Sequence, residues 1–336
     1  MTMVTPAPLV GCAVADMLGK FAETVPADKI LWDGKEVRPG NYKFLQGVYH
    51  NPDELLNRIG VPTDDTQMSR IAGQVLREKG KYDPEAAAEG YRLWLEGNSY
   101  VGPPRGIGGT LKKAILRLMA GASWKDSGER LPLSQPAGTG TAMRDGVLGM
   151  LPNYEAMMDA AMVDAIITHN HPDAVAGSLA MASAVYFTTQ GKYPTGTIYS
   201  TGLPIAALET LKEKGFGHTP LGWALRFVRT QAMSGGTSSP QWFMESYSIQ
   251  NDVVSIVATA IMCAATARSY KEGVELSIRM GGDTDTRAAM VGVILGCRFG
   301  LEGIPEPWLK VLHEREDIER EDRELTVLSR SEVSRG

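Results

Sequence analysis

The sequence is poor in cysteine, and its few cysteines are badly spaced for structural chemistry. The 336 residues include only Cys12, Cys263 and Cys297, an odd number with no C-x-x-C pair. This argues against a disulfide framework and against a zinc knuckle. The residues Leu9-Val10-Gly11-Cys12 look superficially like a lipoprotein cleavage site, but no Lys or Arg precedes them and the apolar stretch is too short for a signal peptide. We therefore expect no lipid anchor.

A long hydrophobic run and a cluster of positive charge are also missing. The longest apolar run, residues 253–267, is shorter than the roughly 20 residues needed to cross a bilayer. The formal net charge is −5, and no basic run is interleaved with aromatic residues, as general phosphate binding would require. We expect a cytoplasmic monomer with no membrane attachment and no general affinity for nucleic acids.

Strand-like alternation is nearly absent, and residues 196–201 are its best, weak example. Helical periodicity dominates, as in the apolar stripe from Met68 to Leu76. The sequence therefore predicts an all-α fold. The predicted helices cover residues 9–23, 84–96, 110–120, 154–168, 172–189, 204–214, 221–232 and 253–264, with two more beginning at residues 63–66 and 283–286.

The domain organisation follows from length and composition. With 43% hydrophobic residues and no convincing linker, the chain suits one large domain, which we expect to be an orthogonal helical bundle over residues 7–312. Residues 313–336 are dense in charge and poor in apolar side chains. We expect this tail to be a solvated helix or disordered, and assign it no chemistry.

Two acidic clusters carry the strongest chemical signal. Thr63-Asp64-Asp65-Thr66 and Gly282-Asp283-Thr284-Asp285-Thr286 each stand just before a segment with helical periodicity. One such cluster could simply cap a helix, but capping needs one oxygen and these clusters offer several. If folding brings them together, the carboxylates repel one another unless cations neutralise them. An all-oxygen ligand set suits Mg²⁺, Mn²⁺ or Ca²⁺, so we infer a pair of hard divalent ions.

Three motifs, in order, resemble the ADP-ribosylglycohydrolase family. They are the run Gly281 to Thr286 with the small-residue segment after it, the run Thr63 to Met68, and the segment Gly11 to Gly19 followed by Glu23. The last resembles the family's Gly-Asp-Ala-Leu-Gly helix with its trailing glutamate. The resemblance extends from about Leu9 to about Leu312.

The resemblance implies an all-α fold with two adjacent Mg²⁺ or Mn²⁺ ions in a cleft for the distal ribose of ADP-ribose. Glu23 matches a glutamate that approaches the metals from a mobile loop, and residues 24–60 would form that loop as a lid. Glu23, Asp64 or Asp65 would relay protons, and the sequence does not choose among them. The metal ligands implied by position are Thr63, Asp64, Asp65, Asp283, Asp285 and Thr286.

Two glycine-rich segments and one histidine are expected to line the substrate cleft. Gly106 and Gly108 precede a helix whose exposed N–H groups favour phosphate. The segment Gly138-Thr139-Gly140-Thr141, which runs on to Met143-Arg144, resembles the family's Gly-Asn-Gly-x-x-Met-Arg loop, with Thr139 where Asn is common. Thr168-His169 matches a Thr-His pair of the family. Without the other motifs, each glycine segment could be a simple turn. Arg144 could be a buried structural arginine, and His171 could only help begin a helix.

The resulting hypothesis is metal-assisted hydrolysis of the bond between the ADP-ribose anomeric carbon and an acceptor. The acceptor stays open: a protein side chain, a nucleic-acid base or a small molecule. Two alternatives are a non-catalytic ADP-ribose or nucleotide binder of the same fold, and a metal-dependent nucleotide phosphatase or nucleosidase. Retention of all six ligand positions favours catalysis.

Overall fold

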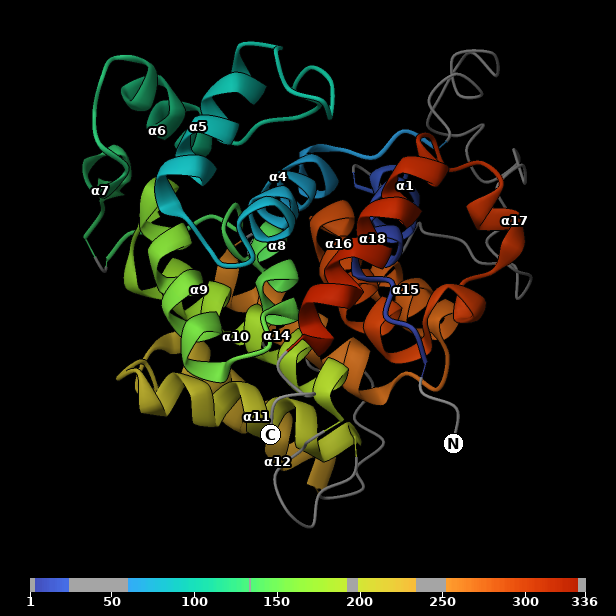
Figure 1. Cartoon of the computed structure of the whole chain (residues 1–336). Coiled ribbons are helices and arrows are strands. Elements are labelled where there is room, and N and C mark those ends of the chain that lie inside the picture. Colours follow the sequence, from blue (N-terminus) through green and yellow to red (C-terminus); the bar gives the residue numbers. More distant parts are fainter. Residues whose placement is uncertain (1–3, 24–59, 133, 192–198, 234–251, 332–336) are drawn as a thin grey trace.

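Helices make up nearly all the regular structure in the computed structural model, which describes residues 4–23, 60–132, 134–191, 199–233 and 252–331 (Figure 1). The all-α prediction is confirmed, and the described part adds one short parallel ladder, β1 (Glu129–Arg130) with β2 (His169–Asn170). The longer helices are α1 (Pro8–Lys20), α4 (Asp64–Lys79), α5 (Pro84–Leu95), α6 (Gly109–Met119), α9 (Tyr154–Thr168), α10 (Pro172–Gln190), α11 (Tyr199–Glu213), α12 (Pro220–Met233), α14 (Val253–Thr266), α15 (Tyr270–Arg279), α16 (Thr284–Phe299) and α18 (Arg315–Arg330). Shorter ones are α7 (Trp124–Ser127), α8 (Ala142–Asp145), α17 (Glu306–Leu309) and the 3₁₀ turns Gly146–Met150 and Leu301–Gly303.

One local prediction is wrong, and one helix was not predicted. The weak strand at 196–201 is wrong where it can be seen, because residues 199–201 begin α11; residues 196–198 lie outside the described part. The helix α15 was not predicted. Its ten residues do carry a short periodic signal, because Tyr270, Val274 and Ile278 are buried at i, i+4 and i+8, but Gly273 and Ser277 occupy the rest of the buried stripe. The proposed lid over residues 24–60 also falls, apart from Gly60, outside the described residues.

The helices α1 and α16 lie side by side, antiparallel, and their backbones touch (Figure 1). Glycines make this possible: a Cβ added at Gly11 would lie 2.3 Å from the carbonyl oxygen of Gly292, and one at Gly292 would lie 2.2 Å from that of Gly11. At the other end, a Cβ at Gly19 would lie 2.4 Å from the carbonyl oxygen of Thr284. The Thr284 hydroxyl donates to the Gly19 carbonyl at 2.7 Å. We call this contact the glycine seam.

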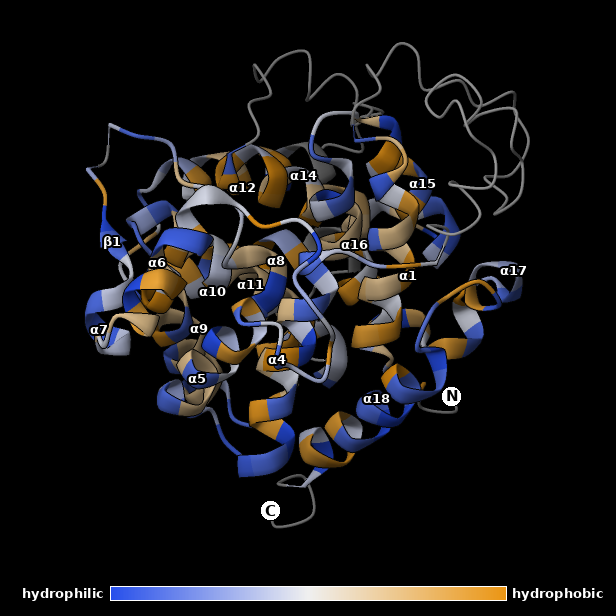
Figure 2. Cartoon of the chain, turned by 90° about the horizontal axis from the view of Figure 1, so that it is seen from above, coloured by the Kyte–Doolittle hydropathy of each residue, from blue (hydrophilic) through white to orange (hydrophobic). Residues whose placement is uncertain are grey.

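Within the predicted tail, residues 315–330 form the packed helix α18, which corrects the expectation of a solvated helix or disorder there; residues 332–336 lie outside the described part. The helix α18 buries Ile318 and Leu325, and Figure 2 shows hydrophobic and hydrophilic residues alternating along it beside α4. The two carboxylate oxygens of Asp322 accept the backbone N–H groups of Leu9 and Val10 at 2.8 and 2.9 Å. An aspartate of α18 therefore caps the start of α1, satisfying donors that no helix can satisfy internally.

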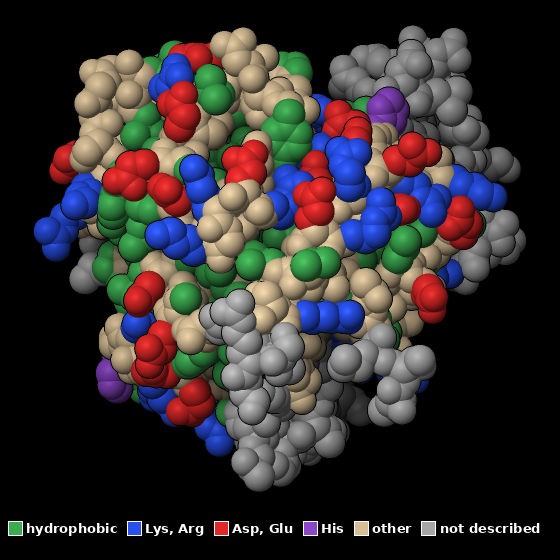
Figure 3. Space-filling view, viewed as in Figure 1, with side chains coloured by type: hydrophobic (Ala, Val, Ile, Leu, Met, Phe, Trp, Pro, Cys, Tyr) green, Lys and Arg blue, Asp and Glu red, His purple; other side chains and the backbone are tan. Residues whose placement is uncertain are grey.

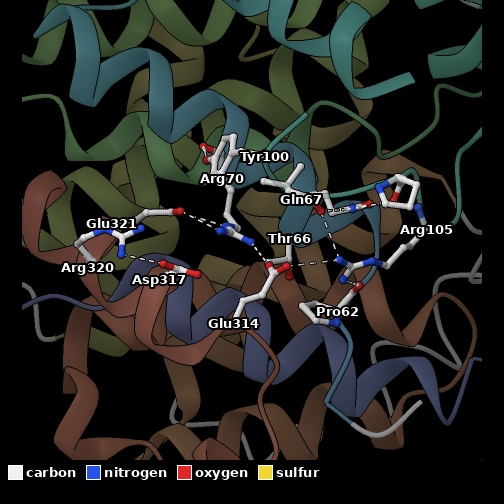
Figure 4. Close-up of polar contacts among 12 residues, drawn as sticks. Pro62, Thr66, Gln67, Arg70, Tyr100, Arg105, Glu314, Asp317, Arg320 and Glu321 are labelled. Carbon is white, nitrogen blue, oxygen red and sulfur yellow. Dashed lines mark hydrogen bonds and ion pairs between the residues drawn. The ribbon is translucent and has the colours of Figure 1, made fainter. Parts of the chain in front are cut away.

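Arginine 70 ties α4 to α18 through a buried ion pair (Figure 4). Its Nε and Nη2 donate to the two carboxylate oxygens of Glu321 at 3.0 and 2.8 Å, and both side chains are buried. Its Nη1 also donates to Glu314 at the start of α18. Such bidentate pairs fix orientation as well as distance. The high charge density of the tail thus reflects specific contacts as well as solvation.

The surface shows mixed charge. Acidic and basic side chains are interspersed over the face drawn in Figure 3, in keeping with the modest net charge. No helix within the described ranges is both long enough and apolar enough to span a bilayer.

The glycine seam predicts that Gly292→Ala destabilises the protein. An alanine in an exposed helix position normally gains about 1 kcal/mol over glycine. At Gly292 the methyl group meets the Gly11 backbone, so we expect a loss of about 2 kcal/mol in the free energy of unfolding, measured by urea denaturation. Gly73→Ala on α4 is the matched control, since its Cβ would make only ordinary contacts from 3.4 Å. Equal effects of the two substitutions would contradict the seam.

The Asp322 cap generates a second stability prediction. Asp322→Ala leaves two backbone N–H groups at the start of α1 without their acceptors and should cost about 2 kcal/mol or more. Asp322→Asn keeps one acceptor oxygen and should cost less. Denaturant midpoints of both variants check this order; an alanine variant as stable as the wild type would show that the tail does not support α1.

Candidate active site

The two predicted acidic clusters lie at helix N-termini, as expected, and folding brings them within electrostatic reach of each other. Thr63 is the N-cap of α4, with its hydroxyl accepting the Asp65 N–H, and Asp283 is the N-cap of α16. The charge of Asp285 raises the pKa values of both Asp64 and Asp65. The glycine seam fixes the α16 cluster against α1. The α4 cluster is in turn bonded to α1 through Asp16.

Asp16 of α1 connects the clusters and was not among the predicted site residues. Its fully buried carboxylate accepts four hydrogen bonds from the start of α4: from the N–H and hydroxyl of Thr63, both at 2.8 Å, and from those of Thr66, at 3.2 and 2.6 Å. Burial, with a contribution from Asp285, raises the pKa of Asp16 to about 7 against these bonds. A single carboxylate inside an otherwise apolar helix is unusual and sets Asp16 apart in the sequence, but it does not show which groups the carboxylate contacts.

The other carboxylates show the cost of crowding negative charge in a buried place. Burial raises the pKa of Asp64 to about 8, aided by the charges of Asp16 and Asp285. Burial and the Asp285 charge raise the pKa of Asp283 to about 7. Burial raises the pKa of Asp65 well above its usual range, and all four other aspartates of the clusters and α1 add to it.

Lys20 and Glu23 lie at the end of α1, at the rim of the acidic group. The Lys20 ammonium is 3.1 Å from Oδ2 of Asp285 and also forms an ion pair with Glu23. The predicted catalytic residue Glu23 is therefore joined to the α16 cluster through a lysine that sequence reasoning did not single out. Lys20 directly follows the segment Gly11 to Gly19, and no neighbouring residue in the sequence indicates that it reaches Asp285.

The residues suit a hard divalent cation, though they do not form a finished ligand sphere. Oδ1 of Asp65 is buried and has no hydrogen-bond partner among the described residues, which is costly unless a cation faces it. The donors are all oxygens, the chemistry of Mg²⁺ and Mn²⁺. As the side chains stand, no three ligand-type side chains in the described ranges converge closely enough to hold a metal. The Thr63 hydroxyl is shared between Asp16 and Asp65, and Asp285 is shared with Lys20.

The first predicted glycine segment lies beside the acidic group. Gly106 has φ +80°, and a Cβ there would lie 3.0 Å from Oδ1 of Asp64. The approach is fixed because Arg105 accepts the Asp64 N–H at 2.9 Å, donates to the Pro62 carbonyl at 3.0 Å and receives support from Gln67 (Figure 4). Gly108 is the exposed N-cap of α6, and a Cβ there would meet open space. The N–H groups that begin α6 are thus accessible close to Asp64.

The second glycine segment packs against His169. A Cβ at Gly140 would lie 2.7 Å from Cε1 of His169, and one at Gly138 would lie 3.7 Å from Nε2. The imidazole is buried, and burial together with the Arg144 charge lowers its pKa to about 3, so the ring is neutral. Thr139 is half-buried in the same turn, whereas the buried Thr141 hydroxyl is committed to the Ala174 carbonyl at 3.0 Å.

Arg144 is a buried arginine paired with an aspartate, which confirms the prediction of a structural role, and its hydrogen bonds hold this segment in place. Its Nε donates to Asp164 at 2.6 Å, its Nη1 to the Gly140 carbonyl, and its Nη2 to the Thr168 hydroxyl at 3.0 Å. The Thr168 hydroxyl, which accepts this bond from Arg144, lies 2.9 Å from Nδ1 of His169 and can donate its own proton to that nitrogen. That arrangement favours the tautomer with the proton on Nε2. His171, also as expected, begins α10 by accepting the Asp173 N–H at 3.1 Å.

The helix α8 links the two groups of site residues. The Ser69 hydroxyl bonds to the Asp65 carbonyl at 2.8 Å and to the Met143 carbonyl of α8 at 3.3 Å. The same short helix carries Arg144. The acidic helix start and the Gly138–Thr141 turn are therefore held by adjoining elements.

Comparison with known sequences identifies the family of the chain. A sequence model described as ADP-ribosylglycohydrolase matches residues 7–333. The chain belongs to the ADP-ribosylglycohydrolase family. The match runs beyond residue 312 and so includes α18, the helix that was expected to be a tail.

Several proteins named for hydrolysis of ADP-ribosyl groups are similar in sequence to this chain. An ADP-ribosyl-dinitrogen reductase glycohydrolase of Rhodospirillum rubrum is 26% identical over 318 residues, 93% of this chain and 90% of that protein. The ADP-ribosylhydrolase ARH3 of Mus musculus is 26% identical over 273 residues, 73% and 71% of the two chains. The ADP-ribosylarginine hydrolase Tri1 of Serratia proteamaculans is 22% identical over 329 residues, 96% and 79%. A solved structure of an ADP-ribosylglycohydrolase-related protein complex shares the fold, with a TM-score of 0.68, 24% identity and 96% of each chain covered.

The raised carboxylate pKa values predict how the metal-free protein responds to pH. Aspartates ionise near pH 4 in the unfolded chain but near 7 at Asp16 and 8 at Asp64 in the folded one. The folded state therefore holds more protons across this window, and its free energy of unfolding should fall as the pH rises from about 5 to about 8. Urea denaturation in excess chelator measures this slope.

Asp16→Asn should flatten that slope, whereas the exposed Asp126→Asn should leave it unchanged. The comparison between variants matters because Asp322, with a pKa raised to about 8 by burial, contributes a slope of the same sign. A slope that Asp16→Asn does not change would contradict the electrostatic account of the clusters.

Proposed function

We propose that this protein is a divalent-metal-dependent hydrolase that releases ADP-ribose from a modified acceptor by cleaving the anomeric glycosidic bond. The observation that carries the proposal is the buried Oδ1 of Asp65, which has no hydrogen-bond partner among the described residues and feels the charges of Asp283 and Asp285 at the other acidic helix start. Family membership supplies the substrate class, since the relatives are named for hydrolysis of ADP-ribosyl groups.

The acidic clusters are proposed to hold two Mg²⁺ or Mn²⁺ ions. Asp64 and Asp65 from the start of α4, and Asp283 and Asp285 from the start of α16, supply the carboxylates, with Thr63 and Thr286 beside them. Bound ions would orient the ribose hydroxyls and polarise the attacking water. Asp16 has a different role: with four hydrogen bonds to the start of α4, it positions the ligands.

The cleavage passes through an oxocarbenium-like state and needs a group that accepts a proton from water. Asp64, Asp65 and Glu23 are the candidates. Asp64 is the best placed, because it is only half-buried and faces both the acidic group and Gly106, whereas Asp65 is buried. Glu23 lies at the rim, paired with Lys20.

The glycine segments are proposed to receive the rest of the nucleotide. The accessible N–H groups at the start of α6 favour the diphosphate, because they and the helix dipole attract negative charge. The Gly138–Gly140 turn and the neutral His169 offer a close backbone surface and one N–H donor. Because burial lowers the pKa of this histidine to about 3, it is a very weak base, and we assign it hydrogen bonding and no proton transfer.

The acceptor is left to experiment. The names of the relatives refer to dinitrogen reductase in one case and to ADP-ribosylarginine in another, which are properties of those proteins. A panel of ADP-ribosylated arginine, serine and DNA, assayed with and without Mg²⁺, identifies the acceptor of this chain.

Asp64→Asn and Asp285→Asn should each lower the rate of ADP-ribose release by more than about 100-fold, because each removes a proposed metal ligand. The matched control is Asp159→Asn, an exposed aspartate 2.8 Å from Lys214, which should keep full activity. Melting curves of all three variants separate lost chemistry from lost folding.

Retained turnover in either ligand variant, or turnover unaffected by chelator, would contradict the metal-dependent mechanism. Tight binding of ADP-ribose by calorimetry without release from any acceptor would instead identify a non-catalytic binder of the same fold.

A further inference from the structure

The acidic centre already contains one positive charge, that of Lys20. Its ammonium lies 3.1 Å from Oδ2 of Asp285, whose side chain is only 6% exposed, and it also pairs with Glu23. Its charge reaches further, since it partly offsets the raised pKa of Asp64 on the facing helix start. Lys20 thus contacts Asp285, a proposed metal ligand from α16, and Glu23. Its charge also acts at longer range on Asp64, a proposed ligand from α4.

This placement differs from an ordinary surface ion pair. Exposed pairs contribute little because water screens both charges. Here one partner is buried among other carboxylates, so the ammonium offsets repulsion that water does not screen. Because the ammonium lies 3.1 Å from this Asp285 oxygen, it would repel a divalent ion bound by the same oxygen.

We propose that Lys20 is a built-in counter-ion of the acidic centre, so that the centre binds one divalent ion tightly and a second one only by displacing the Lys20 ammonium from Asp285. The inference rests on the proposed metal centre. It makes Lys20 a positioning residue: while the second ion is absent, Lys20 holds Asp285 and Glu23 together, and binding of that ion releases Glu23.

The test is a titration of the metal-free full-length protein with Mn²⁺. Binding is measured by calorimetry and by the paramagnetic resonance signal of free Mn²⁺. The wild type should show one tight and one weaker site. Lys20→Met removes the charge and keeps the stem, so its weaker site should tighten by about ten-fold or more. Lys20→Arg should resemble the wild type. Lys310→Met, an exposed lysine near α17, is the matched control and should change neither site.

A second readout is the melting temperature without metal. Lys20→Met should melt below the wild type in chelator, because its carboxylates lose their counter-ion, and excess Mn²⁺ should remove the difference. Equal Mn²⁺ affinities in wild type and Lys20→Met would overturn the proposed role of Lys20 while leaving the metal centre intact. Absence of Mn²⁺ binding in both proteins would overturn the metal centre and the role of Lys20 together.

Discussion

Direct backbone contact between α1 and α16 determines where every charged group of the site lies. Gly11 and Gly292 allow this approach, because any larger side chain would occupy space that the other helix fills. The contact holds Asp16 and Lys20 of α1 against the start of α16, where Asp285 lies. A looser pairing of these helices would separate the acidic clusters and leave two ordinary helix caps.

Negative charge is concentrated because two helix starts are each capped by an aspartate from a different helix. Asp322 of α18 accepts the first N–H groups of α1, and Asp16 of α1 accepts those of α4. Each carboxylate gains hydrogen bonds but loses water, which accounts for the raised pKa values of Asp16 and Asp322. Beside this cap, Asp65 is buried, and its Oδ1 has no hydrogen-bond partner among the described residues. Structural capping and the proposed metal binding are therefore parts of the same electrostatic arrangement.

The helices and the two acidic starts were predictable because their signals are local: apolar spacing within one helix and capping residues before it. The contributions of Asp16, Lys20 and α18 were not, since they depend on contacts between distant parts of the chain. Nothing in the charge-rich sequence around Asp322 shows that its carboxylate reaches the start of α1. The roles of Gly106 and His169 in substrate binding stay predictions; the structure shows that Gly106 lies beside Asp64 and that the Thr168 hydroxyl lies 2.9 Å from Nδ1 of His169.

The most direct test of the account is the position of metal in a crystal of the protein grown with Mn²⁺, located by anomalous scattering. The account predicts a peak within about 2.5 Å of carboxylate oxygens from both helix starts, including Oδ1 of Asp65. A fully ordered site without a peak there, or with Mn²⁺ bound only elsewhere, would contradict it.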